Sequence, residues 1–418
     1  GNGLNRVTLN DGLNTVTGGA AADVFVVNSG TNIVNTGEGT NTVTLNNGSN
    51  TITAGSGADI INASSGTNSI DGGAGDNTIT LSGGTNKVLT GADNDNITAS
   101  SGFNTVDAGA GVNTITLSGG TNSVIASSGN DVFTLSNGTN IVNTGDGVNQ
   151  VTVGNGSNTV KTGTGADTIT LNGGVNSVNA QAGADTITAN NGNNVILAGE
   201  DNNTVYLNNG SNTLTTGAGD DAVVVLSGIQ VIDAGQGANT VTISGGTSNL
   251  TTGSGADTIT VSGGVNTIHA GQGINSITLN NGTNAVTAGS NDDVLVLASG
   301  TNTVNAGDGA NTFTVTGGIN SLTSGTGADR FDVSGGSSTI DAGAGNDSLD
   351  ASGGNNTLMG GLGDDRLQAS AGVNQMDAGE GNNTILLNAG TNTVTAGSGA
   401  DTITAASGTN TITAGDGD

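Results

Sequence analysis

The sequence predicts an all-β fold: a parallel β-solenoid of the two-sheet β-roll type, with 18 residues in each coil. Two observations support this fold. Cutting the chain from Gly1 into blocks of nine gives 46 consecutive units, with no insertion or deletion as far as Ala414. Successive units are of two alternating kinds, so two units make one coil and the chain makes about 23 coils. Self-similarity at a fixed period indicates an architecture in which each repeat packs on its neighbours.

Each unit contains the pattern of one short strand. The seventh residue is Val, Ile, Leu, Phe or Met in all 46 units, whereas the sixth and eighth are mostly Thr, Asn, Ser or Asp. All five Lys and Arg residues fall on the sixth or eighth position. Alternation with a period of two is typical of a half-buried strand. We therefore expect the seventh and ninth residues to face the interior and the sixth and eighth to face outward.

Each unit also contains a turn. The third residue is Gly in 42 of 46 units, and three of the four exceptions are Asp93, Asp201 and Asn291. Glycine adopts a left-handed backbone freely, and Asn and Asp tolerate it better than other residues. The pattern predicts a turn with positive φ at this position, including these three residues.

The two kinds of unit predict two different turns in each coil. Odd units, counted from Gly1, usually begin with Gly, end in an apolar residue and often carry Asp at the fifth position. Even units usually begin with Ser or Asn, end in a small residue and never carry Asp there. One coil is therefore expected to have two strands and two chemically distinct edges.

Composition excludes an ordinary globule and several classes of partner. The chain has 77 Gly, no Pro, Cys or Trp, and a formal net charge of −29. So little apolar surface would usually indicate disorder, but here the apolar residues are strictly periodic. The charge repels nucleic acid and anionic membranes and favours cations. No apolar run approaches the ~18 residues of a membrane span, so we expect neither nucleic-acid binding nor membrane insertion.

The units resemble a known family. Residues Gly360–Gln368 read G-G-L-G-D-D-R-L-Q, and residues Ala342–Asp350 read A-G-A-G-N-D-S-L-D. They are similar to the repeats-in-toxin (RTX) hemolysin-type calcium-binding repeats, G-G-x-G-x-D-x-U-x with U apolar. The resemblance covers the whole chain in one phase. It implies that Ca²⁺ lies between stacked turns, held by backbone carbonyl oxygens and by the Asp of adjacent coils.

The matching position is the fifth residue of the odd units. Here the chain departs from the family, because ten of the 23 coils carry Asn in place of Asp. Adjacent coils keep two carboxylates only where Asp follows Asp, and these coils are the best calcium candidates: Asp167, Asp185, Asp329, Asp347 and Asp365. The remaining aspartates are weaker candidates: Asp23, Asp59, Asp95, Asp131, Asp221, Asp257, Asp293 and Asp401. In the alternative interpretation, Asn amides donate to neighbouring Asp carboxylates in a ladder without metal.

The fifth residue of the even units predicts a second, different edge. It is Asn in 20 of 23 coils, and the exceptions are Gln230, Ser248 and Ser338. Stacked asparagines of this kind form ladders in which each side chain bonds turn backbone and the next Asn. We expect this edge to be structural and to bind no calcium.

The sequence predicts no enzyme, because His269 is the only His, Cys is absent and the acids form rows rather than convergent pairs. The leading hypothesis is a secreted bacterial or cell-surface structural protein, a rod such as an adhesin shaft, an S-layer or sheath component, or a matrix filament that assembles with other copies of itself. A calcium-responsive RTX module attached to an exported protein is the alternative, and ice binding through rows of outward Thr is a minor one. Residues 1–418 are expected to form one continuous solenoid without an internal boundary, either a segment of a longer chain or a unit that stacks end to end.

Overall fold

Strands 18 residues apart pair in parallel and in register. In the computed structural model, which describes residues 3–416, Thr42 of β5 (Thr42–Leu45) lies opposite Ile60 of β7 (Ile60–Ala63). Asn50 of β6 (Ser49–Thr53) lies opposite Asn68 of β8 (Thr67–Asp71) in the same way. Odd-numbered strands belong to one sheet, sheet A, and even-numbered strands to another, sheet B. The predicted 18-residue coil with two parallel strands is confirmed.

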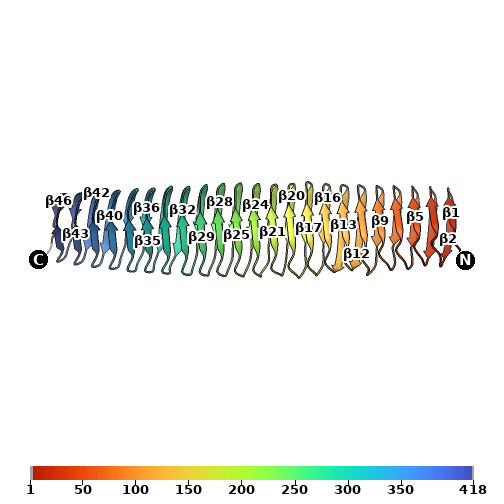
Figure 1. Ribbon diagram of the computed structural model, residues 1–418, viewed down its shortest axis with the longest axis horizontal. Helices are drawn as coiled ribbons and strands as arrows, with labels where there is room; N and C mark the ends of the chain where they lie inside the picture. The colour runs from red at the N-terminus through yellow and green to blue at the C-terminus, as the bar shows by residue number, and fades with distance from the viewer. Residues whose placement is uncertain (1–2, 417–418) are drawn as a thin grey trace. The chain divides into compact units, whose positions relative to one another are not determined.

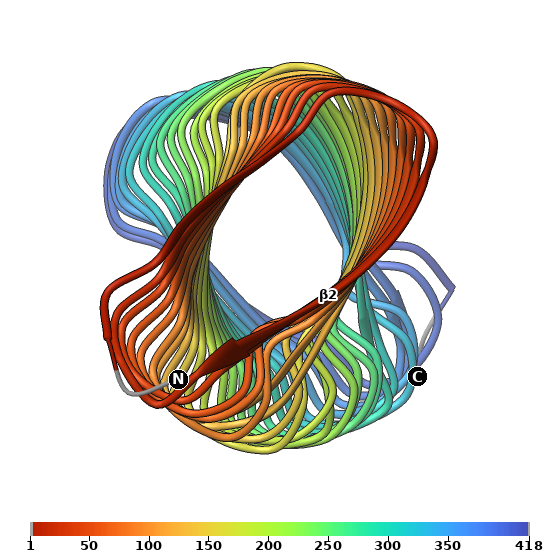
Figure 2. The same cartoon turned by 90° about the vertical axis from the view of Figure 1, so that its right-hand side faces the viewer.

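Residues 3–416 contain strands, turns and bends and no helix, so nothing in this range could cross a membrane as a helix. The chain divides into two units, one formed by residues 1–205 and 210–212 and the other by residues 206–209 and 213–418. Within each unit the strands of consecutive coils lie side by side (Figure 1). Seen end-on, each coil is a loop of backbone (Figure 2). Buried apolar side chains fill its interior. The expectation of one continuous solenoid stays a prediction.

The strands of unit 1 are short and regularly spaced. Those of sheet A are β1 (Arg6–Leu9), β3 (Val24–Val27), β5, β7, β9 (Thr78–Leu81), β11 (Asn96–Ala99), β13 (Thr114–Leu117), β15 (Val132–Leu135), β17 (Gln150–Val153), β19 (Thr168–Leu171) and β21 (Thr186–Ala189). Those of sheet B are β2 (Leu13–Gly19), β4 (Thr31–Gly37), β6, β8, β10 (Thr85–Leu89), β12 (Phe103–Ala110), β14 (Thr121–Ser128), β16 (Thr139–Asn143), β18 (Ser157–Lys161), β20 (Val175–Asn179) and β22 (Asn193–Leu197).

Unit 2 repeats the pattern, and β23 (Thr204–Leu207) and β24 (Ser211–Thr215) contain residues of both units. The strands of sheet A in unit 2 are β25 (Ala222–Val225), β27 (Thr240–Ile243), β29 (Thr258–Val261), β31 (Ser276–Leu279), β33 (Val294–Leu297), β35 (Thr312–Val315), β37 (Arg330–Val333), β39 (Ser348–Ala351), β41 (Arg366–Ala369), β43 (Thr384–Leu387) and β45 (Thr402–Ala405). Those of sheet B are β26 (Ile229–Asp233), β28 (Thr247–Thr251), β30 (Val265–His269), β32 (Thr283–Gly289), β34 (Thr301–Gly307), β36 (Ile319–Thr323), β38 (Ser337–Asp341), β40 (Asn355–Leu362), β42 (Val373–Glu380), β44 (Thr391–Thr395) and β46 (Thr409–Thr413).

The core is built from the inward residues of both sheets. In β5, Val43 and Leu45 are buried while Thr42 and Thr44 are partly exposed. Phe313 and Phe331 of adjacent sheet A strands stack with ring centroids 4.4 Å apart. Burial of one or two apolar side chains per strand drives the coils together. The predicted inward and outward faces are confirmed.

The turn prediction is confirmed for glycine and is wrong for its substitutes. Third-position glycines such as Gly57 have positive φ, but Gln181, a first-position residue, is the one non-glycine residue with positive φ between residues 3 and 416. Asp93, Asp201 and Asn291 therefore do not adopt the left-handed conformation. Their side-chain oxygens instead accept hydrogen bonds from the third-position N–H of the preceding coil, at 2.6, 2.8 and 2.9 Å.

This difference has a simple physical cause. In an ordinary coil the third-position N–H, for example that of Gly57, donates to the second-position carbonyl oxygen of the next coil, that of Ala74, at 3.0 Å. An Asp or Asn side chain supplies an equivalent acceptor. The turn that contains the Asp or Asn therefore does not need the positive φ that only glycine adopts without strain.

Candidate metal-binding edge

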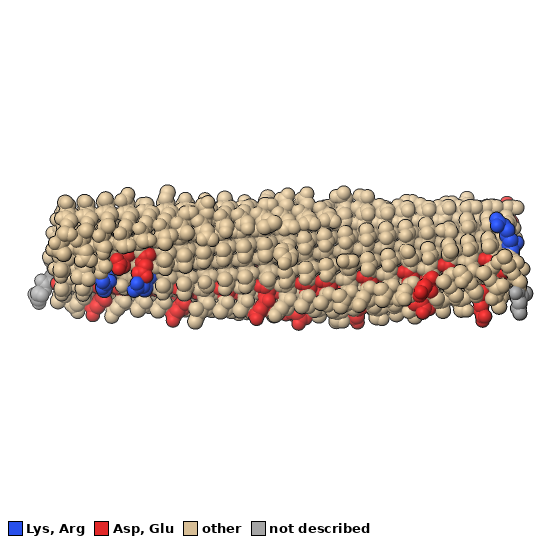
Figure 3. All heavy atoms as spheres, in the orientation of Figure 1, with Lys and Arg blue, Asp and Glu red and all other residues tan. Residues whose placement is uncertain are grey.

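The fifth residues of the odd units line up at one edge of each unit. We call them the mixed column. It contains the thirteen predicted aspartate ligands and ten asparagines, namely Asn5, Asn41, Asn77, Asn113, Asn149, Asn203, Asn239, Asn275, Asn311 and Asn383. From Asp23 to Asn383 every member is at most 2% exposed. On the face drawn in Figure 3, acidic side chains gather along one edge and most of the surface is uncharged.

One oxygen of each side chain ties neighbouring coils together. The backbone N–H of Asn41 donates to Oδ1 of Asp59 at 2.6 Å, and the N–H of Asp59 donates to Oδ1 of Asn77 at 3.0 Å. The same bond links Asn113 to Asp131 at 2.7 Å. Asp and Asn therefore play the same part through Oδ1 and can replace each other without breaking this row.

The second polar atom distinguishes the two residue types. In the Asn coils it is an amide nitrogen, Nδ2, that donates to carbonyl oxygens of its own turn or of the residue 13 positions later. Asn77 Nδ2 reaches the oxygen of Gly75 at 2.7 Å. Asn275 Nδ2 reaches those of Gly273 at 3.0 Å and Ala288 at 3.3 Å. This nitrogen therefore lies among several carbonyl oxygens.

In the Asp coils the corresponding atom is a carboxylate oxygen, which cannot donate. Oδ2 is buried and has no hydrogen-bond partner in Asp59, Asp95, Asp131, Asp167, Asp185, Asp257, Asp293, Asp329, Asp347, Asp365 and Asp401. Asp23 differs, because the N–H of Gly19 donates to its Oδ2 at 3.2 Å. A buried charged oxygen without a partner is strongly unfavourable. A cation or a proton beside Oδ2 would remove this penalty.

In the coil that matches the family pattern best, glycine at position 360 keeps a side chain away from two oxygens. A Cβ placed on Gly360 would lie 2.5 Å from Oδ2 of Asp365 and 2.5 Å from the carbonyl oxygen of Ala378. A side chain at position 360 would collide with both oxygens, so glycine there leaves them uncovered on that side. Both are hard oxygen donors of the kind that Ca²⁺ prefers.

Burial changes the acidity of these carboxyls. It raises the pKa of Asp59, Asp293 and Asp365 to about 6, although a backbone N–H from the preceding coil opposes the change. Burial, together with the charge of a neighbouring Asp, raises the pKa of Asp185 and Asp347 to about 7. Both causes penalise the charged form. The coils where Asp follows Asp thus concentrate the least compensated negative charge.

The five best candidates lie in two groups of successive coils, a pair and a triplet, as predicted. The N–H of Asp167 donates to Oδ1 of Asp185 at 2.7 Å, that of Asp329 to Asp347 at 2.7 Å and that of Asp347 to Asp365 at 2.8 Å. Within residues 3–416, no three side chains of His, Cys, Asp or Glu group around one point. A cation here would therefore depend on one or two carboxylates and on turn carbonyl oxygens. Calcium binding by these five residues stays a prediction.

The alternative ladder, in which Asn amides donate to Asp carboxylates, describes one end of the column. Asn5 Nδ2 donates to Oδ1 of Asp23 at 2.9 Å. Further along, Asn41 Nδ2 donates to the carbonyl oxygen of Gly39 at 2.8 Å, and the bond to Asp59 comes from the Asn41 backbone. The amide group is directed into its own turn because the turn carbonyls converge there.

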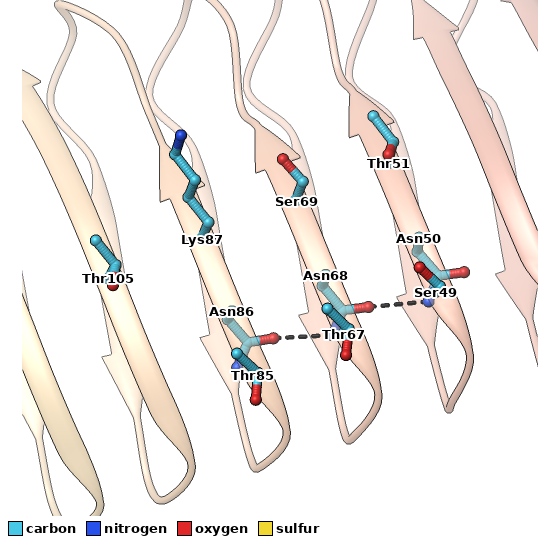
Figure 4. A pocket seen from close by; sticks show the side chains of 10 residues that line it. All are labelled: Ser49, Asn50, Thr51, Thr67, Asn68, Ser69, Thr85, Asn86, Lys87 and Thr105. Atoms are coloured by element: carbon cyan, nitrogen blue, oxygen red, sulfur yellow. Dashed lines mark hydrogen bonds between the residues drawn. The ribbon is translucent and has the colours of Figure 1, made fainter.

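The opposite edge is an asparagine ladder, as predicted, and it is unbroken in unit 1. In unit 1, Nδ2 of each fifth-position Asn from Asn14 to Asn194 donates to Oδ1 of the Asn 18 residues later, at 2.6–2.9 Å. Figure 4 shows Asn50, Asn68 and Asn86 in this row, where they line a pocket of about 290 Å³ together with Ser and Thr side chains and Lys87. Each donor and acceptor in the row is neutral, so the row requires no metal.

Comparison with known families agrees with this geometry. A family model for the RTX calcium-binding nonapeptide repeat, covering four copies, matches residues 8–43, 44–79, 89–124, 116–151, 152–187, 188–223, 242–277, 278–313, 287–322, 323–358, 350–385 and 387–418. The chain belongs to this RTX repeat family. No curated protein matches the chain.

The RTX repeats are calcium-binding, and the residues of this chain fit calcium. The mixed column offers only oxygen atoms to a cation in its Asp coils, and in most of them Oδ2 has no hydrogen-bond partner. Hard oxygen donors are the ligands that Ca²⁺ prefers. Bound calcium would supply the positive charge that the buried carboxylates lack.

Sequence reasoning missed a second row just outside the mixed column. Asn94 Oδ1 accepts the backbone N–H of Val112 at 2.7 Å, and Asp292 Oδ1 accepts that of Ala310 at 2.7 Å. These residues occupy the fourth position of odd units, where Asp and Asn recur. That recurrence is the signal that could have revealed the row.

Proposed function

We propose that this chain is an extracellular structural repeat protein, held on one edge by an asparagine ladder and on the other by calcium at its aspartate coils. The buried Oδ2 atoms without partners carry the proposal. Each is an uncompensated charge that calcium would neutralise. The proposed role of the metal is therefore to stabilise the fold.

The ligand set favours a location rich in calcium. Most sites lie between an Asp coil and an Asn coil and have one carboxylate where the family pattern has two. Affinity falls with fewer charged ligands, and extracellular calcium modules bind at about 10⁻⁴–10⁻³ M. RTX repeat proteins are typically secreted bacterial proteins, which agrees with a cell-surface or extracellular role.

A structural role, rather than a catalytic one, agrees with the family to which the chain belongs. The RTX repeat is a calcium-binding structural fold and not an enzyme family. We propose that the coils form a rod that serves as an adhesin shaft, a sheath or S-layer component, or a filament made with other copies. Imaging of the isolated protein tests assembly: end-to-end or lateral arrays are expected, and dispersed monomers alone would contradict it.

Circular dichroism with and without calcium tests the main proposal. The asparagine ladder and the Asn coils need no metal, so the β-signal should survive in chelator while added calcium raises the melting temperature. An unchanged melting temperature would show that calcium does not stabilise the fold. Collapse to coil in chelator would instead support the alternative, a calcium-responsive module that folds after export.

Ice binding has one supporting observation. Thr168 and Thr170 of β19 lie in register with Thr186 and Thr188 of β21 on the outer face of sheet A. Gln150 of β17 interrupts the row. Ice crystals that grow with unaltered shape in the presence of the protein would dismiss this function.

A further inference from the structure

We infer that the asparagines of the mixed column replace the cation within their own coils, so that the number of calcium ions is set by the Asp coils. This inference rests on the proposed function. It goes beyond the family pattern, because it assigns a function to the asparagines, which depart from that pattern.

The position of the amide nitrogen is the first observation. Asn149 Nδ2 lies 3.1 Å from the carbonyl oxygen of Gly145 and 3.2 Å from that of Gly147. Asn239 Nδ2 lies 3.3 Å from the oxygens of Gly237 and Thr252. The carbonyl two residues before the Asn accepts a bond from Nδ2 in every Asn coil. A second carbonyl, three or four residues before the Asn or 13 residues after it, joins it in most of these coils. An N–H group, with its partial positive charge, meets these oxygens.

In an Asp coil, a negatively charged carboxylate oxygen takes the place of the amide nitrogen near the turn carbonyls. The carbonyl oxygen of Ala378, 13 residues after Asp365, lies near Oδ2 of that Asp, because both are 2.5 Å from the position that a Cβ on Gly360 would occupy. In the Asn383 coil, the corresponding carbonyl, that of Ala396, accepts a hydrogen bond from Nδ2 at 3.5 Å. Two oxygens that face one point repel each other unless a positive group lies between them. The Asn amide provides such a group and Asp does not.

The exchange of Asp for Asn leaves the rest of the coil intact. The backbone N–H of the preceding coil donates to Oδ1 in both cases, at 2.7 Å to Asp131 and 3.0 Å to Asn149. An Asn coil is therefore complete without metal, whereas an Asp coil whose Oδ2 has no partner lacks one positive group. Where Asp coils and Asn coils alternate, as in residues 41–149, about half as many calcium ions are then needed as in a stretch of Asp coils alone.

Two substitutions in the full chain test this inference. Asn113→Asp should add one bound calcium per chain at saturating calcium chloride and lower the melting temperature in EGTA. Asp131→Asn should remove one calcium and raise the melting temperature in EGTA. Bound calcium is counted by equilibrium dialysis with atomic absorption, and melting is followed by circular dichroism.

Asn122→Asp, in the asparagine ladder of the other edge, is the matched control. Its side chain bonds Asn140 and the carbonyl of Gly119, so the substitution should lower stability with and without calcium and add no calcium. If wild-type protein binds calcium but either test variant leaves the count unchanged, the inference is overturned and the proposed function stands. If wild-type protein binds none, the proposed function itself fails.

Discussion

At the scale of single residues, the mixed column buries a carboxylate oxygen without a hydrogen-bond partner in most of its Asp coils. Asp347 illustrates the situation: Oδ1 accepts an N–H, Oδ2 has no partner, and the residue is 2% exposed. Desolvation of a carboxylate is costly, so a bound proton or metal ion would stabilise the group. The calcium-free protein should therefore respond to pH in an unusual direction.

We predict that calcium-free protein is more stable at pH 5 than at pH 8. In the folded state, burial raises the pKa of Asp59 and Asp365 to about 6 and that of Asp185 and Asp347 to about 7, from an ordinary value of 3.8. Folding then takes up protons, so this stabilisation is complete below about pH 4 and is lost as the pH rises through 6–7. The loss should reach roughly a few kcal/mol after solvent screening, because one pKa unit corresponds to about 1.4 kcal/mol.

Urea unfolding of metal-stripped protein across this pH range measures the effect. Calcium competes with protons for the same oxygens, so saturating calcium should flatten or reverse the trend. A urea midpoint that rises steadily from pH 5 to pH 8 without metal would contradict the assignment of buried carboxylates.

The asparagine ladder makes a second prediction at this scale. Ser338 accepts from Asn320 Nδ2 at 3.3 Å but leaves Oδ1 of Asn356, in the next coil, buried without a partner. Ser338→Asn should restore that bond and raise the free energy of unfolding by about 1–2 kcal/mol. Ser337→Asn, an exposed neighbour, is the control and should change little. A thermal melt of Ser338→Asn that matches wild type would show that the ladder bond contributes no net stability.

At the scale of the coil, backbone contact between turns limits which residues fit. A Cβ on Gly109 would lie 1.6 Å from the carbonyl oxygen of Gly91 in the preceding coil, and φ there is +69°. The odd-unit turns therefore stack through glycine. This explains the recurring first-position Gly better than the backbone conformation alone does.

We predict that Gly109→Ala destabilises the protein by more than about 3 kcal/mol, because coils must separate to admit the methyl group. Gly12→Ala is the matched control: φ is +93°, but nothing lies within 4 Å of a Cβ there. The control should cost about 1 kcal/mol of left-handed strain. Equal losses in denaturant unfolding would mean that strain, and not stacking, accounts for the glycines.

The coil was largely predictable from the sequence, because its signals are local. The seventh-position apolar residue identified the interior, and the fifth-position Asn of even units identified the ladder. Two features depend on atoms that the repeat alone does not place. One is the side-chain bond that lets Asp93 avoid positive φ. The other is the direction of amides such as Asn77 Nδ2, set by carbonyls of its own turn and of the residue 13 positions later.

At the scale of the whole chain, charge and repetition act together. The net charge is −29, and the mixed column contributes thirteen of the acidic residues. Self-repulsion of this kind opposes a compact state. Calcium at the Asp coils would reduce this repulsion. It would also take the place that the side-chain amide takes in the Asn coils. The central claim is therefore that calcium binds at Asp coils and not at Asn coils.

The most direct measurement is anomalous difference density from crystals of the protein grown in calcium. The account predicts peaks beside Oδ2 of the Asp coils, the strongest along Asp329, Asp347 and Asp365, and none beside Nδ2 of Asn coils such as Asn113. Density absent from every Asp coil at saturating calcium, or present equally in Asn coils, would contradict it.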